Sequence, residues 1–494
     1  MNADSPNPTH IRPRCANLKN RSVYAILILM LLVAAYLLFV NLDIAPIPDY
    51  DAPIHGINAY EMIRNNDYLV HTARGGVDYW NLKPPLTMWS IVLFYHLFGF
   101  TIFAFRFYSP LSMLLMMVII TFWLKRRHGS ASALAVMALL LATQIIYHYH
   151  FGRDGDPDSQ FQLFFTIAML CMLESPRNFR MLYGSAVCFG LAFLAKSGHA
   201  LFIPVICFAF VMSCKQRKQL TIKRGLLLIG AGVFPILPWA VARFTRDGFA
   251  FFSKMITIDL VARVTSALEY SDEPFSFYFV SIVTQPIFIA CALLSVLCWV
   301  LCKMNGRKLQ AGTQQVVKGC ILWAVIPPIV YSFAVTKHFW YVFGSWLAMV
   351  LMAAVLVGEA VRNGRPGALR ACILGLTLAF CVQQTVANIT YVSSLRPNNR
   401  YTMMLKENLD RDWHTGMHIY IQYNEEINKW NLSDMLVALL YGDVIPLPGG
   451  VQAFEDDEDD SLLLIGKKRI AEITRVEEYS YPLDEDYYVM LFVK

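Results

Sequence analysis

A polar stretch of about forty residues, from Asp49 to Leu86, carries side chains that could do chemistry. Asp49 and Asp51 stand at its start, and Lys83 stands near its end before two prolines. An ionised carboxylate can remove a proton as a general base, and a lysine can stabilise charge that develops on a phosphate. The stretch follows an apolar segment, and ionisable groups beside a membrane are costly and usually functional. These residues predict a site for acid–base and phosphate chemistry.

The composition indicates a membrane protein. The chain has 494 residues, of which 56% are hydrophobic and 16% are charged, whereas about 25% are charged in soluble domains. The first apolar segment, 23–42, follows basic residues and lacks a small-residue cleavage site, so we expect a retained membrane helix rather than a signal peptide. The net charge of +6 is modest and spread over short loops, which argues against nucleic-acid binding.

Apolar windows and loop charges predict an all-α polytopic fold with about eleven transmembrane helices. The windows are 23–42, 104–124, 131–148, 159–174, 181–195, 199–213, 225–243, 276–302, 317–335, 339–357 and 368–387. If the N-terminus is cytoplasmic, alternate loops should be rich in Lys and Arg. The five inner loops carry sixteen such residues, whereas the three short outer loops carry only Arg153, Lys196 and Lys337. This asymmetry supports the predicted order of inner and outer loops, and with eleven spans it places the C-terminus outside.

The same pattern predicts the domain organisation. We expect a cytoplasmic N-terminus at 1–22, a transmembrane domain at 23–387 with its first periplasmic loop at 43–103, and a periplasmic C-terminal domain at 388–494. In the last of these, three strand-like runs around a helix-like run predict a small α/β domain. These runs are 417–422, 462–465 and 487–493, with the helix-like run at 433–440.

A short apolar segment in the first outer loop needs a separate explanation. Leu86–Phe98 is too short to span a bilayer, and an extra span there would invert every later loop. We therefore expect an interfacial helix with Trp89 and Tyr95 at the level of the lipid headgroups.

The cysteines and the acidic run indicate neither disulfides nor a metal site. Eleven cysteines are present, and all but Cys15 lie within or beside apolar segments, where thiols behave as small hydrophobes. No CxxC pair occurs. The acidic run 455–460 is expected to be a solvated loop.

Single lysines in the outer loops lie directly against apolar segments, at Lys196 and Lys337. Such positions oppose the positive-inside bias, so an anionic partner is expected, with snorkelling to lipid headgroups as the alternative. A lipid phosphate carrying a sugar would be such a partner, because its leaving phosphate gains charge as the glycosidic bond breaks. One carboxylate near the acceptor hydroxyl then suffices as the base.

Several short motifs occur in a fixed order between residues 49 and 350. Asp51 is followed by Glu61-Met62 and by the Lys83-Pro84-Pro85 motif; further stretches are Phe105-Arg106, Gly155-Asp156-Pro157-Asp158, Leu191–Lys196, Pro274–Tyr278 and Thr336-Lys337 with Tyr341. Each is short, and their shared order carries the argument. In this order they resemble the GT-C glycosyltransferases of the bacterial aminoarabinose transferase (ArnT-like) and protein O-mannosyltransferase group.

The resemblance implies a polyprenyl-phosphate sugar donor, expected to be undecaprenyl phosphate, and assigns roles to residues. The catalytic candidates are Asp51 as general base, and Asp158 as the second functional carboxylate with Asp156 as its alternate. The candidates for the donor phosphate are Lys83, Lys196, Lys337 and Arg263. The secondary candidates are Asp49, His55 and Tyr341. Simpler alternatives stay open: Asp158 could cap a helix that begins near Ser159, Lys83 could anchor the loop at the interface, and His55 could be an ordinary hydrogen-bonded residue.

The sequence also departs from that group. Leu82 stands where aminoarabinose transferases usually have an acid, Ser271 stands where they tend to have His, and Ala52 stands where they usually have Glu. The first two changes weaken the case for a bound metal and for aminoarabinose as the sugar. No residue is assigned as a metal ligand, no cofactor is required, and a divalent cation stays an option.

The predicted function is sugar transfer to a cell-envelope acceptor at the periplasmic face of the bacterial inner membrane. Lipopolysaccharide (lipid A, core or O-antigen) is the expected acceptor, with a protein hydroxyl as the alternative. A transporter or flippase for an anionic lipid is the rival from another class, although the sequence shows neither inverted repeats nor interrupted helices of the kind typical of transporters. A catalytically silent scaffold is the third reading.

Overall fold

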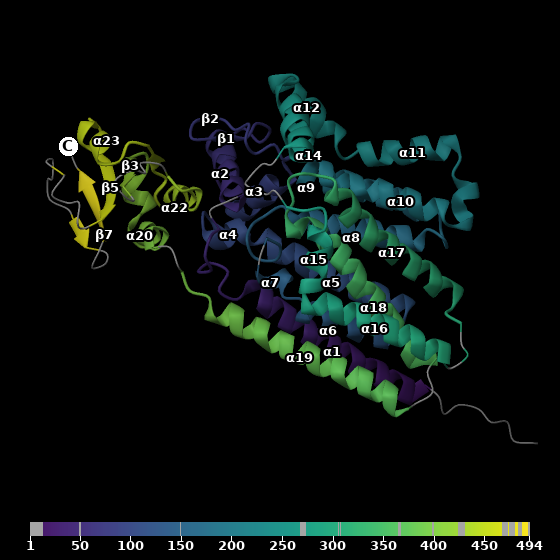
Figure 1. The fold of residues 1–494 in the computed structure, drawn as a ribbon. Helices are drawn as coiled ribbons and strands as arrows, with labels where there is room; N and C mark the ends of the chain where they lie inside the picture. Colours follow the sequence, from purple (N-terminus) through teal and green to yellow (C-terminus); the bar gives the residue numbers. More distant parts are fainter. Residues whose placement is uncertain are drawn as a thin grey trace, which may run out of the picture.

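In the computed structural model, a bundle of long helices lies on one side, a small sheet lies on the other, and the helices of the first outer loop lie between them (Figure 1). The structure describes residues 13–48, 51–148, 150–266, 273–304, 306, 308–363, 367–397, 400–422, 430–466, 473, 480–482 and 487–492.

The bundle begins with α1 (Pro13–Phe39) and ends with α19 (Ala368–Ser394), which lie side by side along one edge (Figure 1). Its other helices are α5 (Tyr108–Arg127), α6 (Ser130–Ala142), α7 (Ile145–His148), α8 (Asp158–Glu174), α9 (Met181–Lys196), α10 (Phe202–Met212), α11 (Ile222–Val233), α12 (Leu237–Asp247), α15 (Phe277–Thr284), α16 (Pro286–Met304), α17 (Ala311–Ser332) and α18 (Phe343–Asn363). Helix α18 packs against α6, α16 and α17 and forms the centre of the main hydrophobic core.

The connecting segments form short elements of their own. In the first outer loop these are α2 (Asp51–Arg64), the hairpin of β1 (Thr72–Ala73) and β2 (Gly76–Val77), α3 (Leu86–Phe98) and α4 (Ile102–Arg106). Elsewhere they are the 3-10 helices η1 (Ser197–Leu201), η2 (Lys215–Gln219) and η4 (Phe339–Val342), then α13 (Ala250–Lys254), the π-helical η3 (Met255–Ala262) and α14 (Arg263–Thr265).

Each of the eleven predicted windows overlaps helical residues, and the chain is a multi-pass membrane protein. Seven of the described helical runs are long and apolar enough to cross a membrane, or eight if the bent pair α11–α12 forms one span. One of the seven, Met181–Met212, turns back at η1: Gln216 donates a hydrogen bond to Ser175 (2.9 Å), and Ser185 lies 3.2 Å from Cys207. Helices α9 and α10 are therefore antiparallel, as predicted. The number eleven itself remains a prediction.

Two buried arginines hold the segment that leaves α1. The guanidinium of Arg106 donates hydrogen bonds to the carbonyl oxygens of Leu42 (2.9 Å), Ala45 (2.8 Å) and Pro46 (2.6 Å). Arg153 likewise donates to three carbonyl oxygens, those of Leu37, Leu38 and Val40. The last carbonyls of a helix lack intrahelical partners and favour nearby cations. The route from α1 toward α2 is thereby determined by α4 and by the loop before α8.

Helix α3 spans the predicted residues but lies differently from the prediction. Its outer edge exposes Leu93, Leu97 and Phe98, as expected of an interfacial helix. Tyr95, however, is 2% exposed and its hydroxyl lies 3.4 Å from the carbonyl oxygen of Gly56. The prediction that Tyr95 lies at headgroup level is wrong, because this side chain faces the core of the loop.

The C-terminal segment forms a mixed five-stranded sheet with strand order β4-β3-β5-β7-β6. The strands are β3 (His418–Gln422), β4 (Ile445–Pro446), β5 (Ser461–Gly466), β6 (Ser480–Pro482) and β7 (Tyr487–Phe492), and the helices are α20 (Arg400–Asn408), α21 (Arg411–His414), α22 (Leu432–Gly442) and α23 (Gly450–Asp456). Strand β5 is parallel to β3 and antiparallel to β7. Since α19 continues to Ser394, the expected boundary at 387 lies within a helix.

One hydrophobic core joins this segment to the first outer loop. Alternate residues of β3 and β5 face α22, and α22 in turn packs against α2. Gly56 of α2 lies close to α22: a Cβ atom there would lie 2.8 Å from Leu436 Cδ1 and 3.0 Å from Phe105 Cδ2. The helix that begins at Asp51 is therefore supported by the C-terminal segment.

Enlarging residue 56 should weaken this packing. We expect Gly56→Val to lower the free energy of unfolding by about 1–3 kcal/mol, because the extra methyl groups overfill a closed contact. The apparent Tm of the purified protein measures the change. In the double variant Gly56→Val/Leu436→Ala, the smaller side chain at 436 should make room for the valine and recover part of the lost stability. Gly76→Val is the matched control, because no atom lies within 4 Å of a Cβ at that position. Equal shifts for the two glycines would contradict the packing described.

Candidate active site

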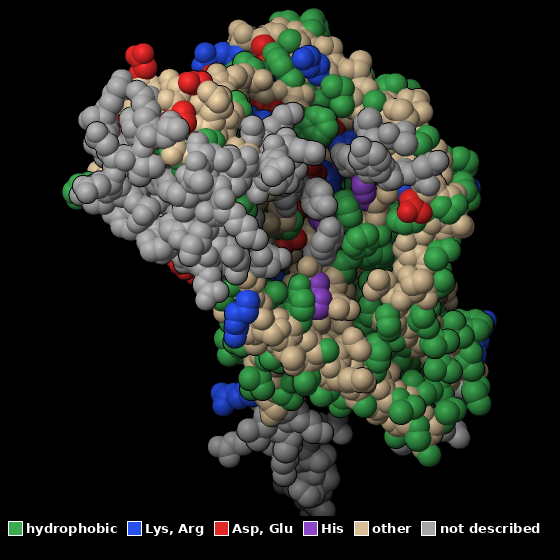
Figure 2. All heavy atoms as spheres, turned by 60° about the vertical axis from the view of Figure 1, so that its left-hand side comes forward, with side chains coloured by type: hydrophobic (Ala, Val, Ile, Leu, Met, Phe, Trp, Pro, Cys, Tyr) green, Lys and Arg blue, Asp and Glu red, His purple; other side chains and the backbone are tan. Residues whose placement is uncertain are grey.

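A cavity of about 460 Å³ lies where the first outer loop meets η1, α14 and the connection between α17 and α18. Figure 2 shows a hollow on one face of the molecule with acidic, basic and histidine side chains around it. Five of the ten predicted site residues line the cavity: Asp51, Lys83, Lys196, Arg263 and Tyr341. Residues from 51 to 341 thus meet at one place.

Asp51 and Lys83 face each other across the cavity wall. Asp51 is the first residue of α2, and its side chain is 44% exposed; its carboxylate lies 3.6 Å from Lys83 Nζ. The Lys83 ammonium lowers the pKa of Asp51 far below its usual value, although burial acts in the opposite direction. Burial opposes the charge on Lys83, but the Asp51 carboxylate outweighs it and the pKa of Lys83 is raised. Both groups are ionised in this arrangement.

Lys196 is held differently. Both carboxylate oxygens of Asp158 accept hydrogen bonds from its Nζ, and both side chains are 8% exposed. Asp158 is the first residue of α8, but its side chain makes no capping hydrogen bond there. Asp158 is therefore neither the predicted cap nor a lining residue of the cavity. It is the counter-ion of Lys196.

Arg263, the first residue of α14, lines the cavity together with residues of the first loop. Its guanidinium donates hydrogen bonds to Asp259 (3.3 Å) and to the Tyr341 hydroxyl (3.3 Å). The Tyr341 ring also lies 5.5 Å from Lys196 Nζ. Tyr341 therefore contacts two cations and orients both toward one space.

Asp156 belongs to a separate, buried group. Its carboxylate lies 3.0 Å from Nδ1 of His150, and it is 2% exposed. The His150 ring stacks on Trp340 at 3.9 Å, and His338 stacks on Trp340 at 4.5 Å. Trp340 and His338 line the cavity, whereas Asp156 does not. The structure gives Asp156 a supporting place behind the wall.

Two further candidates that the structure describes, Lys337 and His55, do not line the cavity. Lys337 donates a hydrogen bond to the carbonyl oxygen of Glu273 (2.8 Å), and His55 is fully buried beneath Asp51 on α2. Asp49 lies outside the described residues. The roles predicted for these three residues remain predictions.

One wall of the cavity is apolar and continues to the outside of the bundle. Leu201, Val205, Val264, Val330 and Phe333 line it, and each is between 46% and 72% exposed. In a membrane protein such exposed apolar side chains face lipid. The cavity therefore combines a charged end with a side that a hydrocarbon chain can occupy.

Sequence reasoning assigned no role to several lining residues. Asp259, the ion-pair partner of Arg263, was one of many outer-loop acids, and its spacing of four from Arg263 on a helix was the available signal. The contact between His199 and the Tyr331 hydroxyl (2.5 Å) joins residues 132 positions apart, and the sequence carried no signal for it.

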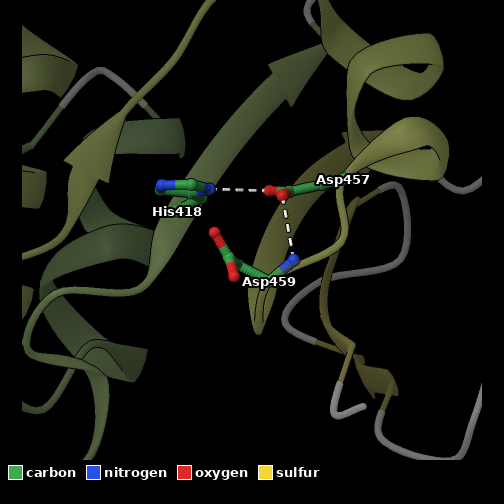
Figure 3. Close-up of side chains that lie close together, drawn as sticks. All are labelled: His418, Asp457 and Asp459. Atoms are coloured by element: carbon green, nitrogen blue, oxygen red, sulfur yellow. Dashed lines mark hydrogen bonds and ion pairs between the residues drawn. The ribbon is translucent and has the colours of Figure 1, made fainter.

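The described residues contain one group of three side chains that could hold a metal ion, and it lies in the C-terminal sheet away from the cavity. His418 Nδ1 lies 2.8 Å from Asp457, the backbone N–H of Asp459 donates to Asp457, and the three side chains converge (Figure 3). Tyr420 also donates to Asp457. These groups already satisfy one another, and Asp459 is exposed.

The chain is similar in sequence to known sugar transferases. The family described as dolichyl-phosphate-mannose-protein mannosyltransferase matches residues 82–241. The undecaprenyl phosphate-alpha-4-amino-4-deoxy-L-arabinose arabinosyl transferase of Edwardsiella ictaluri is 27% identical over 346 residues, covering 66% of this chain and 60% of that relative. The enzyme of the same name from Aeromonas hydrophila is 23% identical over 339 residues, covering 67% and 59%. The chain thus spans about 60% of the length of these curated relatives.

Solved structures show the same fold. The crystal structure of ArnT from Cupriavidus metallidurans bound to undecaprenyl phosphate matches with a TM-score of 0.67 at 14% identity, covering 95% of this chain and 98% of that one. The apo oligosaccharyltransferase of Archaeoglobus fulgidus matches with a TM-score of 0.52 at 12% identity, covering 92% and 70%.

The chain is a polytopic membrane protein whose fold is that of the solved ArnT structures. The matches confirm the resemblance to the aminoarabinose transferase and protein mannosyltransferase group that the ordered motifs predicted.

Breaking the Lys196–Asp158 pair should be costly for stability. Either Lys196→Met or Asp158→Leu alone leaves a buried charge without its partner, at about 3–5 kcal/mol. The double variant removes both charges and should lose less stability than either single variant. Apparent Tm values of the four proteins measure this coupling. Arg246→Met, which breaks an exposed pair with Asp67 at 3.9 Å, is the control and should cost under about 1 kcal/mol; additive losses at 196 and 158 would contradict the pairing.

Proposed function

We propose that the protein is a membrane glycosyltransferase that moves a sugar from a polyprenyl phosphate, such as undecaprenyl phosphate, to a cell-envelope acceptor. The observation that carries the proposal is the composition of the cavity lined by Asp51, Lys83 and Arg263. A carboxylate, Asp51, faces two cations, Lys83 and Arg263, and an exposed apolar wall leads away from them. A lipid phosphate that bears a sugar matches these surfaces. Its hydrocarbon tail fits the apolar wall, its phosphate fits the two cations, and its sugar lies within reach of the Asp51 carboxylate.

In the proposed reaction, the lipid tail lies along the apolar wall and the phosphate lies between Lys83 and Arg263. The acceptor hydroxyl oxygen attacks the anomeric carbon, its proton passes to Asp51, and the bond from that carbon to the phosphate oxygen breaks. The products are the glycosylated acceptor and the free polyprenyl phosphate. The two cations stabilise the charge that develops on the leaving phosphate, and a single displacement inverts the anomeric carbon.

Donor binding would also make Asp51 a better base. In the donor-free arrangement Lys83 lowers the pKa of Asp51, and a base of low pKa accepts a proton poorly. A phosphate that takes Lys83 as its partner removes part of this effect and adds a negative charge nearby. The pKa of Asp51 then rises toward a useful value only when a donor is present.

The acceptor and the location rest on the relatives and on the loop charges. Lipopolysaccharide, most simply lipid A, is the proposed acceptor because the curated relatives are aminoarabinosyl transferases. A protein hydroxyl is the second candidate, favoured by the description of the matching family. The positive-inside pattern favours the bacterial inner membrane, with the N-terminus cytoplasmic and with the cavity and the C-terminal segment periplasmic.

Replacing the base should abolish transfer without abolishing donor binding. We expect Asp51→Asn to lower kcat by about 10²–10⁴-fold, because the amide keeps the side chain's size but cannot take the proton. The measurement is release of free polyprenyl phosphate from a labelled donor by the purified protein. This readout also separates transfer, which consumes the donor, from transport, which conserves it.

Asp67→Asn is the matched control for that experiment. It makes the same change in the same loop, outside the cavity, and Asn keeps the acceptor oxygen for the Leu69 N–H. Activity should be unchanged. A fully active Asp51→Asn protein would remove Asp51 from the mechanism.

Removing Lys83 should have two effects. Lys83→Met should weaken donor binding by about ten- to a hundredfold, the cost of one charge-assisted hydrogen bond. It should also raise the pKa of Asp51 in the free protein, because the largest lowering cause is gone and burial still acts upward. The acid limb of kcat/KM, where Asp51 becomes protonated, should therefore move to higher pH.

Arg246→Met is the control for the loss of a cation near the same loop. It should change neither donor binding nor the acid limb. An acid limb that stays in place in Lys83→Met would show that Asp51 is not the titrating base.

A further inference from the structure

A buried network of hydrogen bonds lies beneath the catalytic carboxylate. The Nδ2 atom of Asn81 lies 2.8 Å from Nδ1 of His55 and 2.7 Å from Oδ1 of Asn58. The Oδ1 atom of Asn81 accepts the backbone N–H of Lys83 (3.4 Å). His55 and Asn58 are fully buried and Asn81 is 2% exposed. The network therefore connects the lysine motif to the helix that begins at Asp51.

The network determines which nitrogen of His55 carries the proton. An amide nitrogen can only donate, so Nδ1 of His55 must accept and the proton must lie on Nε2. The orientation of the amides is itself held, because Asn58 Nδ2 donates to the Asp78 carboxylate (3.0 Å) and to the Thr72 carbonyl oxygen (2.8 Å). Burial lowers the pKa of His55 well below its usual value, so the imidazole is neutral.

The Nε2–H group of His55 is buried and has no hydrogen-bond partner among the described residues. A buried donor of this kind needs an acceptor. His55 follows Asp51 by four positions on α2, so both side chains lie on the same face of that helix. The charged and titratable groups that act on His55 include Asp51, Lys83, His71 and Lys196. The Asp78 carboxylate of the same network already accepts from Asn58 Nδ2 and from the backbone N–H groups of Trp80 and Asn81, whereas Asp51 is the carboxylate on the same face of α2.

We propose that His55 is a positioning residue for Asp51: its Nε2–H donates to the Asp51 carboxylate once the donor phosphate has drawn Lys83 away. This inference rests on the proposed function. When His55 replaces Lys83 as the partner of Asp51, the buried Nε2–H gains an acceptor. The Asp51 carboxylate also stays oriented after Lys83 has moved to the phosphate. A neutral donor holds the carboxylate without the full positive charge that makes it a weak base, and the carboxylate's other oxygen is left for the acceptor hydroxyl.

Asn81→Asp tests the proposal, because it changes a donor into an acceptor with almost no change in shape. His55 should then carry its proton on Nδ1 and present the Nε2 lone pair to Asp51, which repels it. We expect kcat to fall at least tenfold at neutral pH while donor binding is unchanged. Activity should recover toward acid pH, where the imidazole beside the new carboxylate takes a second proton and Nε2–H returns. The wild type should show no such recovery.

Asn65→Asp is the matched control. It adds the same charge just after α2, at an exposed side chain that donates a hydrogen bond to the Thr72 hydroxyl (3.0 Å), and it should leave kcat and its pH profile unchanged. His55→Gln, whose amide N–H can replace Nε2–H, should retain more activity than His55→Phe.

A wild-type kcat in His55→Phe, or a pH profile of Asn81→Asp parallel to that of the wild type, would overturn the positioning role. Either result would leave the proposed function intact as long as the wild type releases polyprenyl phosphate. If the wild type consumes no donor, the proposed function fails instead.

Discussion

The position of the first outer loop depends on two buried guanidinium groups. Arg106 and Arg153 together take up carbonyl oxygens between Leu37 and Pro46, where α1 ends and the chain turns toward Asp51. Those carbonyls would otherwise be unsatisfied at a helix end inside a membrane protein, which is costly. Burying an arginine is costly too, and the multiple hydrogen bonds offset that cost. The start of α2 is therefore connected to α4 and to the loop before α8, so Asp51 is placed by residues far away in the sequence.

The way each cation is paired decides which cations can serve a substrate. Lys196 and Asp158 are buried with each other, and a phosphate could take Lys196 only by leaving Asp158 as an uncompensated charge. Lys83 pairs with an Asp51 side chain that is 44% exposed, so exchanging that partner costs less. Arg263 is hydrogen-bonded to Asp259 and to the Tyr341 hydroxyl, both of which line the cavity with it. Two lysines that line the same cavity are thus paired differently: Lys196 is buried with its carboxylate, whereas the carboxylate partner of Lys83 is partly exposed.

Much of the fold could be predicted from the sequence because hydropathy is local. The windows overlap helices, α3 has its expected bounds, and three C-terminal strands lie on the expected runs. Asp51, Lys83 and Arg263 could be named from residue type, spacing and resemblance. The pairing of Asp158 with Lys196 could not, because it joins two helices through a contact that neither sequence segment records. Tyr95 was misplaced for a related reason: an aromatic residue on a short apolar helix fits a lipid interface and a loop core equally well, and only the packing of α2 decides between them.

Position 82 shows how packing limits the chemistry of the site. Where relatives of this group usually carry an acid, Leu82 is 1% exposed and packs in an apolar cluster with Leu194, Trp239 and Phe251. An acid at this place would be buried among hydrocarbon side chains, so the cluster and the acid exclude each other. Leu82 therefore contributes packing rather than a ligand. Because Lys83 is the next residue, the packing of Leu82 also fixes the backbone position of Lys83. The neighbouring Asn81 is polar, and its side-chain amide makes a hydrogen bond with the buried His55 rather than lining the cavity. In the proposed reaction the charge of a bound phosphate is met by Lys83 and Arg263, which line the cavity.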